Sequence, residues 1–132
     1  MFVIPKKMYK GMVDFSNKEK PNEACGLIGG VEGRAEIFYP MTNVDKSPNS
    51  YFMDPKEQIS VMKDIRKRNM KMVAIFHSHP HGSAYPSQKD VNMAFYPVVY
   101  LILSLEEPQE LRGFRIDRER GTVKEVEIKI EE

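Results

Sequence analysis

The sequence has one cysteine, no tryptophan and only three histidines. A single cysteine, Cys25, excludes any disulfide within the chain and fits a reducing compartment, so we expect a cytoplasmic protein. No apolar stretch approaches the roughly 18 residues of a membrane-spanning helix, and the apolar start over residues 1–4 is too short for a signal sequence. These absences argue against secretion and against membrane insertion.

The sequence also lacks an excess of charge of either sign. Twenty Lys and Arg residues against nineteen Asp and Glu residues give a net charge of +1, which offers no reason to expect nucleic acid as a partner. A basic cluster over residues 63–71 fits a solvated helix end, where cations complement the helix dipole. At 132 residues the chain leaves no room for a second core, so we expect a single domain over residues 1–132.

Three segments are predicted in the first part of the chain. Apolar residues at helical spacing predict a helix over about residues 6–18. Two apolar runs separated by a glycine-containing turn then predict a hairpin over residues 23–30 and 34–39. Residues 41–53, rich in Asn, Ser, Pro and Asp, form a long connection whose last part, residues 50–53, we interpret as a brief edge strand.

A second helix has a clear start signal. Asp54 is a good N-cap, Pro55 suits the first helical position, and Glu57 stands at the position from which a carboxylate reaches back to the cap. Apolar residues at helical spacing predict that this helix runs to about Asn69.

The remaining segments complete an α/β domain. An apolar run over residues 72–76 predicts a strand that ends in the two histidines, and a short helix is expected over about residues 88–95. Residues 98–103 are continuously apolar, as in a central strand covered on both faces. Residues 111–116 and 122–130 are predicted as two further strands, and the second of them has one solvent-exposed face. The sum is a mixed β-sheet with three helices packed on it.

Two histidines at the end of the strand over residues 72–79 indicate a metal site. Side chains at positions i and i+2 of a strand point to the same side with Cα atoms about 6.5 to 7 Å apart, so His77 and His79 can converge on one ion. Two histidines and a carboxylate, with a fourth position left to water, distinguish catalytic from structural zinc. Asp90 is the candidate carboxylate, although Ser87-x-x-Asp90 also matches a capping box.

The spacing H-S-H-P-x6-S-x2-D, preceded by a glutamate in the setting N-E-A-C-G-L-I-G-G, resembles the JAMM (MPN-plus) zinc metalloprotease family. All five motif positions are present, and the small size resembles that of prokaryotic members. The resemblance implies the JAMM/MPN fold, whose layout is similar to that of cytidine deaminases. The five positions are Glu23, His77, His79, Ser87 and Asp90.

The resemblance also implies a role for each motif residue. His77, His79 and Asp90 would bind Zn²⁺, with water in the fourth position. Glu23 would hold and deprotonate that water, and Ser87 would steady the oxyanion that forms on an amide carbonyl. The chemistry is sound, because zinc with two neutral imidazoles and one carboxylate keeps a positive charge that brings the pKa of bound water to about 7.

The implied activity is a zinc-dependent isopeptidase or peptidase that hydrolyses the amide bond after the C-terminal Gly-Gly of a ubiquitin-like or sulfur-carrier protein. Residues 51–53 are the candidate edge at which such a tail would add as a strand. The alternative is a non-catalytic MPN-type scaffold or ubiquitin-like-protein binding module. The residues leave open the choice between isopeptide and linear amide, between monomer and homodimer, and between zinc and other divalent metals.

Competing zinc signatures are absent. The sequence has no H-E-x-x-H, and one cysteine cannot supply the P-C-x-x-C of zinc deaminases. Cys25 shares the strand face of Glu23, but a buried structural thiol is the favoured interpretation. For His81, which follows the motif, a solvent-exposed loop position is favoured over contact with substrate or metal.

Overall fold

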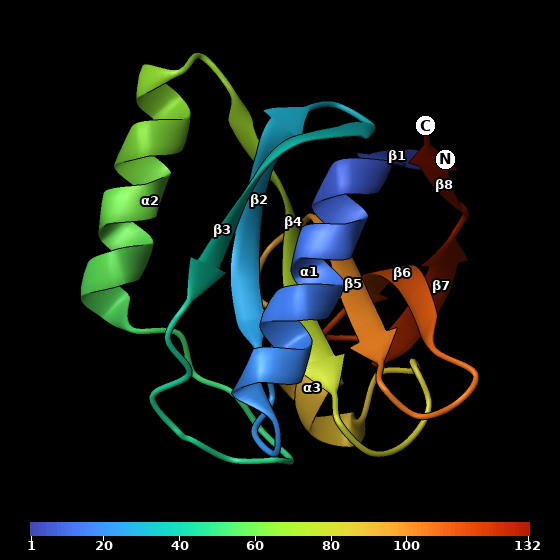
Figure 1. Cartoon of the computed structure of the whole chain (residues 1–132). Helices are drawn as coiled ribbons and strands as arrows, with labels where there is room; N and C mark the ends of the chain where they lie inside the picture. Colours follow the sequence, from blue (N-terminus) through green and yellow to red (C-terminus); the bar gives the residue numbers. More distant parts are fainter.

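The polypeptide, described over residues 1–132 by a computed structural model, folds into eight strands and three helices around one mixed sheet (Figure 1). The strand order across the sheet is β7-β6-β5-β4-β2-β3-β1-β8. In chain order the elements are β1 (Phe2–Pro5), α1 (Lys6–Glu19), β2 (Cys25–Val31), β3 (Arg34–Met41), α2 (Pro55–Lys67), β4 (Lys71–His79), α3 (Gln88–Asn92), β5 (Val99–Ser104), β6 (Glu110–Asp117), β7 (Thr122–Val126) and β8 (Ile128–Glu131).

The sheet is mixed, as the sequence predicted. Strand β4 lies between β2, which runs antiparallel to it, and β5, which runs parallel. Strand β5 is buried at all six positions, which confirms a central strand covered on both faces. The two strands that flank β4 therefore hold it by hydrogen bonds along both edges.

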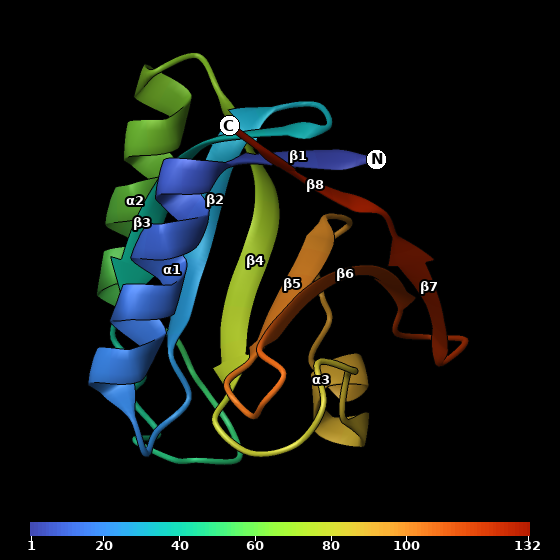
Figure 2. The same cartoon turned by 45° about the vertical axis from the view of Figure 1, so that its right-hand side comes forward.

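The helices cover both faces of the sheet. Alternate residues of β4 point to opposite faces, so Phe76 packs in a cluster that includes Met12 of α1, whereas Ile75 packs in a second cluster against which Met62 of α2 lies. Figure 2 shows α1 and α2 beside the strands and α3 near the end of β4. His77 and His79 follow the parity of Ile75 and thus share the α2 face of the sheet.

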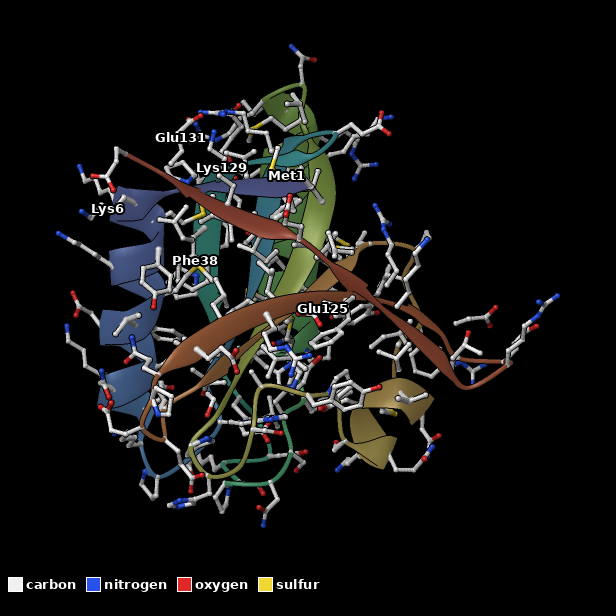
Figure 3. The ribbon with its side chains drawn as sticks, turned by 90° about the vertical axis from the view of Figure 1, so that its right-hand side faces the viewer. Met1, Lys6, Phe38, Glu125, Lys129 and Glu131 are labelled. Atoms are coloured by element: carbon white, nitrogen blue, oxygen red, sulfur yellow. The ribbon has the colours of Figure 1, made fainter.

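The C-terminal stretch predicted as one strand is divided into two, and this is a correction. Strand β7 pairs antiparallel with β6, whereas β8 pairs in parallel with β1 at the other end of the sheet. Figure 3 shows this ribbon running past Glu125 and Lys129, so the same stretch of chain borders both ends of the sheet and curls it toward a barrel. The break falls at Glu127, whose carbonyl accepts a 2.8 Å hydrogen bond from the Phe2 backbone N–H.

Strand β1 was not predicted. Residues 2–5 are too few to show a periodicity, and their partners, β3 and β8, are distant in sequence. Phe2 and Ile4 are nevertheless almost fully buried. The N-terminal apolar residues thus form part of the core.

The predicted start of the second helix is confirmed at Asp54. Its carboxylate accepts hydrogen bonds from the backbone N–H groups of Lys56 and Glu57, at 2.9 and 3.4 Å. Glu57 does not reach back to the cap; it accepts from the backbone N–H and hydroxyl of Thr42, at 2.8 and 2.7 Å. The helix therefore anchors the long connection that precedes it.

Two further expectations are corrected. The short third helix ends at Asn92 and not near residue 95, and the backbone N–H of Tyr96 donates to the Tyr100 hydroxyl at 3.1 Å. Residues 50–53 form no strand and make only an isolated bridge between Met53 and Asn43. Their backbone is held by a side chain, as described below. No helix has the length and apolar character required to cross a membrane.

The fold predicts opposite effects for two glycine-to-alanine substitutions. A Cβ at Gly26 in β2 would lie 2.6 Å from the Tyr39 carbonyl oxygen, a backbone atom that cannot move away, whereas a Cβ at Gly11 in α1 meets nothing within 4 Å. We expect Gly26→Ala to destabilise the protein by about 1 to 3 kcal/mol through overpacking. Gly11→Ala should stabilise it by about 0.5 to 1 kcal/mol. Urea denaturation measures both, and equal effects would contradict the described packing of β2.

Candidate metal centre

The last residues of β4 carry the two histidines. His77 pairs with Cys25 of β2 and with Ile102 of β5, so neighbouring strands flank it on both sides. The side chains of His77 and His79 are buried, with 1% and 8% of their surface exposed. Each buried imidazole needs a partner for the ring nitrogens that water does not reach, and two imidazoles on one face of the strand can share one.

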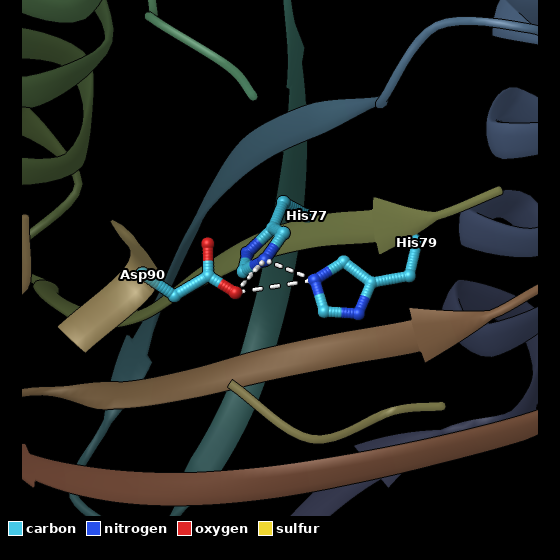
Figure 4. Close-up of side chains that lie close together, drawn as sticks. All are labelled: His77, His79 and Asp90. Atoms are coloured by element: carbon cyan, nitrogen blue, oxygen red, sulfur yellow. Dashed lines mark hydrogen bonds and ion pairs between the residues drawn. The ribbon is translucent and has the colours of Figure 1, made fainter. Parts of the chain in front are cut away.

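The structure brings His77, His79 and Asp90 together at one point (Figure 4). The two Nε2 atoms are 3.2 Å apart, and the Asp90 Oδ2 atom lies 3.2 Å from the first and 3.1 Å from the second. Zinc bonds of about 2.0 to 2.1 Å in a tetrahedron require ligand atoms about 3.3 to 3.4 Å apart. The triangle of these three atoms therefore fits a tetrahedral cation above it with a small expansion.

The tautomer of His79 suits a metal ligand. Its Nδ1 lies 2.7 Å from the Ser83 carbonyl oxygen. A carbonyl only accepts, so Nδ1 carries the proton and Nε2 presents a lone pair to the cluster. The ring of His77 is stacked on Tyr51 with centroids 4.7 Å apart, which fixes its plane, while its Nδ1 has no hydrogen-bond partner.

Asp90 belongs to a capping box and to the cluster at the same time. The Ser87 hydroxyl accepts from the Asp90 backbone N–H at 3.1 Å, and the Ser87 backbone N–H donates to Oδ2 of Asp90 at 2.9 Å. The two interpretations of Ser87-x-x-Asp90 are therefore compatible, because the cap fixes the carboxylate that faces the histidines. Burial raises the pKa of Asp90, but attraction to His77, the close contacts with both imidazole rings and the hydrogen bond from the Ser87 backbone N–H outweigh burial and hold that pKa well below its usual range.

Glu23 lies across from His79. The register of β2 with β4 continues past the strand, since the Ser78 backbone N–H donates to the Ala24 carbonyl oxygen at 2.9 Å. The Ser78 hydroxyl also accepts from the Ala24 backbone N–H at 2.8 Å. One further step of antiparallel register sets Glu23 opposite His79 on the same face.

The carboxyl group of Glu23 is buried without a partner. The residue is 4% exposed, and its Oε1 atom accepts no hydrogen bond. Burial raises the pKa of Glu23 to about 7, and attraction to His77 and His79 opposes that rise in part. A buried carboxyl beside the cluster with a free acceptor atom can take a proton from a group placed between them.

Ser87 lies at the surface beside Asp90. Its hydroxyl oxygen accepts a backbone hydrogen bond in the cap, and its own proton is free to donate. The structure thus leaves a donor at the rim of the cluster.

The other two candidates lie outside the cluster. The Cys25 side chain is fully buried in the core, and burial raises the pKa of its thiol to about 12, as in an inert structural cysteine. The His81 side chain is 76% exposed, and its nearest charged neighbour is Glu106 at 3.9 Å. Both match the favoured interpretations of the sequence.

A pocket of about 220 Å³ adjoins the cluster. It lies between residues 50–53 on one side and residues 89–96 on the other, and Asp90 forms part of its wall. Most of the lining is apolar and aromatic, from residues such as Tyr51, Phe52 and Tyr96. No sequence pattern predicts the second side of this pocket, because the exposed aromatic residues after α3 follow no periodicity.

A family model for prokaryotic homologs of the JAB domain matches residues 5–117. This chain belongs to the Prok-JAB family. The match spans α1 to β6 and all five motif positions, so the membership that the motif implied is confirmed.

Two relatives of this Prok-JAB protein are named enzymes. The CysO-cysteine peptidase of Mycobacterium tuberculosis (strain ATCC 25618 / H37Rv) is 38% identical over 121 residues, which cover 88% of this chain and 83% of the relative. The desampylase of Pyrococcus furiosus is 33% identical over 110 residues, which cover 83% and 76%. With the JAMM motif intact, these relatives show that the chain is a hydrolase of the JAMM type.

Two solved structures share the fold. The solution structure of protein DSY2949 from Desulfitobacterium hafniense superposes with a TM-score of 0.90 at 41% identity, and covers 100% of this chain and 94% of that one. AF2198, a JAB1/MPN domain protein from Archaeoglobus fulgidus, superposes with a TM-score of 0.67 at 16% identity, and covers 98% and 97%. The predicted JAMM/MPN fold is therefore confirmed.

The geometry predicts that metal binding depends on two of the three histidines. His77→Ala and His79→Ala should each weaken zinc binding by more than about 100-fold, because each removes a ligand. His81→Ala is the matched control and should keep the wild-type affinity. Competition titration with a chromogenic chelator measures the affinities, and an effect of His81→Ala equal to the other two would refute the site.

The burial of Glu23 predicts a pH-dependent stability of the metal-free protein. A folded-state pKa of about 7, raised from 4.5, means that the folded state binds the proton more tightly, so stability is lost as pH rises from about 4.5 to 7. Glu23→Gln removes this penalty and should raise the Tm of the chelator-treated protein by roughly 5 °C at pH 8, with no gain at pH 4. Thermal unfolding followed by circular dichroism measures the difference. A gain of the same size at both pH values would show that the carboxyl is not perturbed by burial.

Proposed function

We propose that this protein is a zinc-dependent peptidase or isopeptidase that cleaves the amide bond after the C-terminal Gly-Gly of a ubiquitin-like or sulfur-carrier protein. The observation that carries the proposal is the triangle formed by His77, His79 and Asp90 with the buried carboxyl of Glu23 beside it. Two imidazoles and one carboxylate are the donor set of catalytic zinc sites that keep an open position. Zinc bound there supplies Lewis acidity, which polarises a carbonyl and lowers the pKa of water.

Glu23 is the proposed general base. Its unpartnered Oε1 atom is free to accept a proton from water and to pass it to the departing amine. Burial disfavours the charged carboxylate whereas nearby positive charge favours it, so the group can both accept and release a proton during turnover.

Ser87 is the proposed donor to the oxyanion. Its hydroxyl proton is not used in the cap, and the backbone hydrogen bond from Asp90 fixes the oxygen. A fixed donor aimed at developing negative charge lowers the barrier without reorganisation.

The pocket beside Asp90 is the proposed site of the substrate tail. In its wall, the backbone groups of Ser50 and Phe52 point into the protein. There they form hydrogen bonds with the Asn43 amide and, for the Phe52 carbonyl oxygen, with the Val44 backbone N–H. The backbone groups of Tyr51 and Met53 make no hydrogen bond within the protein. This alternation is that of a strand with one free edge, so an extended tail can pair there, and glycine at the scissile bond avoids a clash with the aromatic walls.

The names of the relatives support a protein conjugate as the substrate class. One is a CysO-cysteine peptidase and the other a desampylase. The leaving amine, whether a free amino acid or a lysine side chain, is left to the experiment below.

The proposal predicts a separation of metal binding from turnover. Glu23→Ala should keep one zinc per chain and lose cleavage of a ubiquitin-like fusion that ends in Gly-Gly, because Glu23 is not among the ligands. Ser87→Ala should lower kcat about 100-fold to 1000-fold, as for the loss of an oxyanion donor. Cleavage is followed by gel electrophoresis and mass spectrometry, with the linear fusion, a lysine-linked conjugate and a cysteine adduct compared.

The control is His81→Ala, which should cleave like the wild type. A zinc-loaded wild-type protein that binds the tail but leaves all three conjugates intact would favour the non-catalytic binding module. Full turnover by Glu23→Ala would remove Glu23 from the reaction.

A further inference from the structure

Glu23 is held by contacts that a strand ladder does not supply. It precedes β2, and its backbone N–H donates to the Ser47 carbonyl oxygen at 2.8 Å. Its own carbonyl oxygen accepts from Nδ2 of Asn43 at 3.0 Å. The position of the Glu23 side chain therefore depends on the long connection between β3 and α2.

Asn43 is a buried polar junction in that connection. The residue is 5% exposed, yet its amide uses all its hydrogen-bonding capacity. Nδ2 donates to the carbonyl oxygens of Glu23 and Ser50, both at 3.0 Å. Oδ1 accepts from the backbone N–H groups of Asp45 and Phe52, at 3.1 and 3.0 Å. Because a flipped amide would oppose like groups at all four contacts, the orientation of the amide is determined.

Two of the four hydrogen bonds of Asn43, those to Ser50 and Phe52, connect it to the wall of the pocket. Ser50 and Phe52, which both bond to Asn43, flank Tyr51, whose ring stacks on His77. The same two bonds leave the backbone groups of Tyr51 facing away from Asn43, toward the proposed tail. In place of a neighbouring strand, one side chain thus organises the wall of the pocket.

We infer that Asn43 is a positioning residue that sets the carboxyl of Glu23 and the Tyr51 wall of the pocket as one unit. The inference rests on the proposed function, since it concerns the base and the tail site of that reaction. Asn43 itself belongs neither to the cluster nor to the pocket lining, but it bonds to the backbone of two lining residues, Ser50 and Phe52. It acts only through the backbone groups that it bonds.

The test is Asn43→Asp, which keeps the shape of the side chain and the two accepting contacts but turns both donors into acceptors. The two carbonyl oxygens, of Glu23 and Ser50, then face a carboxylate. We expect zinc content to stay at one per chain, kcat on the Gly-Gly fusion to fall about 100-fold through misplacement of the base, and KM to rise. Asn49→Asp is the matched control, because Asn49 lies in the same connection with an exposed side chain. It should keep both constants.

A double variant separates positioning from general loss of folded protein. If Asn43 acts on the rate through Glu23, then Asn43→Asp should leave the residual kcat of Glu23→Gln unchanged, because the effects of residues that act as a unit are not additive. In the same Glu23→Gln background, binding of the uncleaved fusion should still weaken severalfold, through the Tyr51 wall. A merely structural role would lower kcat by the same factor in both backgrounds.

The outcomes are distinct. A wild-type enzyme that cleaves the fusion, with Asn43→Asp indistinguishable from Asn49→Asp, overturns this inference and leaves the proposed function standing. A wild type without cleavage overturns the proposed function. If Asn43→Asp does not fold, Asn43→Ser, which is neutral and leaves room for a water, replaces it with the same expectations. If neither variant gives a folded, zinc-loaded protein, Asn43 is a folding residue and the inference is wrong.

Discussion

The hydrogen-bonded register of β4 between β2 and β5 is the constraint on which the rest of the site depends. Strand parity sends His77 and His79 to the same face, and the pairing of β4 with β2 sets Glu23 opposite the second histidine. A shift by one residue would turn both imidazoles toward the α1 face and bring Ser78 to the site. The ladder on both edges of β4 opposes that shift, because it would also exchange the apolar residues that fill the two faces, moving Phe76 out of the α1 cluster and Ile75 out of the α2 cluster.

Where the regular backbone ladder ends, hydrogen bonds from polar side chains hold the neighbouring segments in position. Ser78 pairs with Ala24 through both its backbone and its hydroxyl, so the register extends beyond Cys25, the first residue of β2. The cap formed by Ser87 fixes Asp90, and the amide of Asn43 replaces a neighbouring strand along the pocket wall. The site thus combines a rigid strand, which holds the histidines, with connections whose geometry is determined by buried hydrogen bonds.

Local patterns in the sequence predict the mixed sheet, the three helices and the shared face of His77 and His79, because helical and strand periodicities are short-range features. Asp90 by itself matches only a capping box, and the resemblance to the JAMM motif is what joined it to the histidines. Contacts between distant segments escape such patterns. Strand β1 is too short to show a period, and β8 leaves β7 to pair with it only because the curled sheet brings both ends together. Residues 50–53 were predicted as a strand, and their backbone groups do alternate between the protein interior and the pocket. The groups that point inward, from Ser50 and Phe52, bond to the side chain of Asn43 and not to a neighbouring strand. Asn43 opens a segment that resembles the family's stretch ahead of its second helix, but no local pattern indicates which groups its amide bonds.

We propose that one cation binds between two imidazoles and a carboxylate and keeps a position open to solvent. Zinc-edge X-ray absorption of the zinc-loaded protein tests it most directly. We expect only nitrogen and oxygen neighbours at about 2.0 to 2.1 Å, with multiple scattering from two imidazole rings. A sulfur neighbour at about 2.3 Å, which would implicate Cys25, or a third imidazole from His81 would contradict the account.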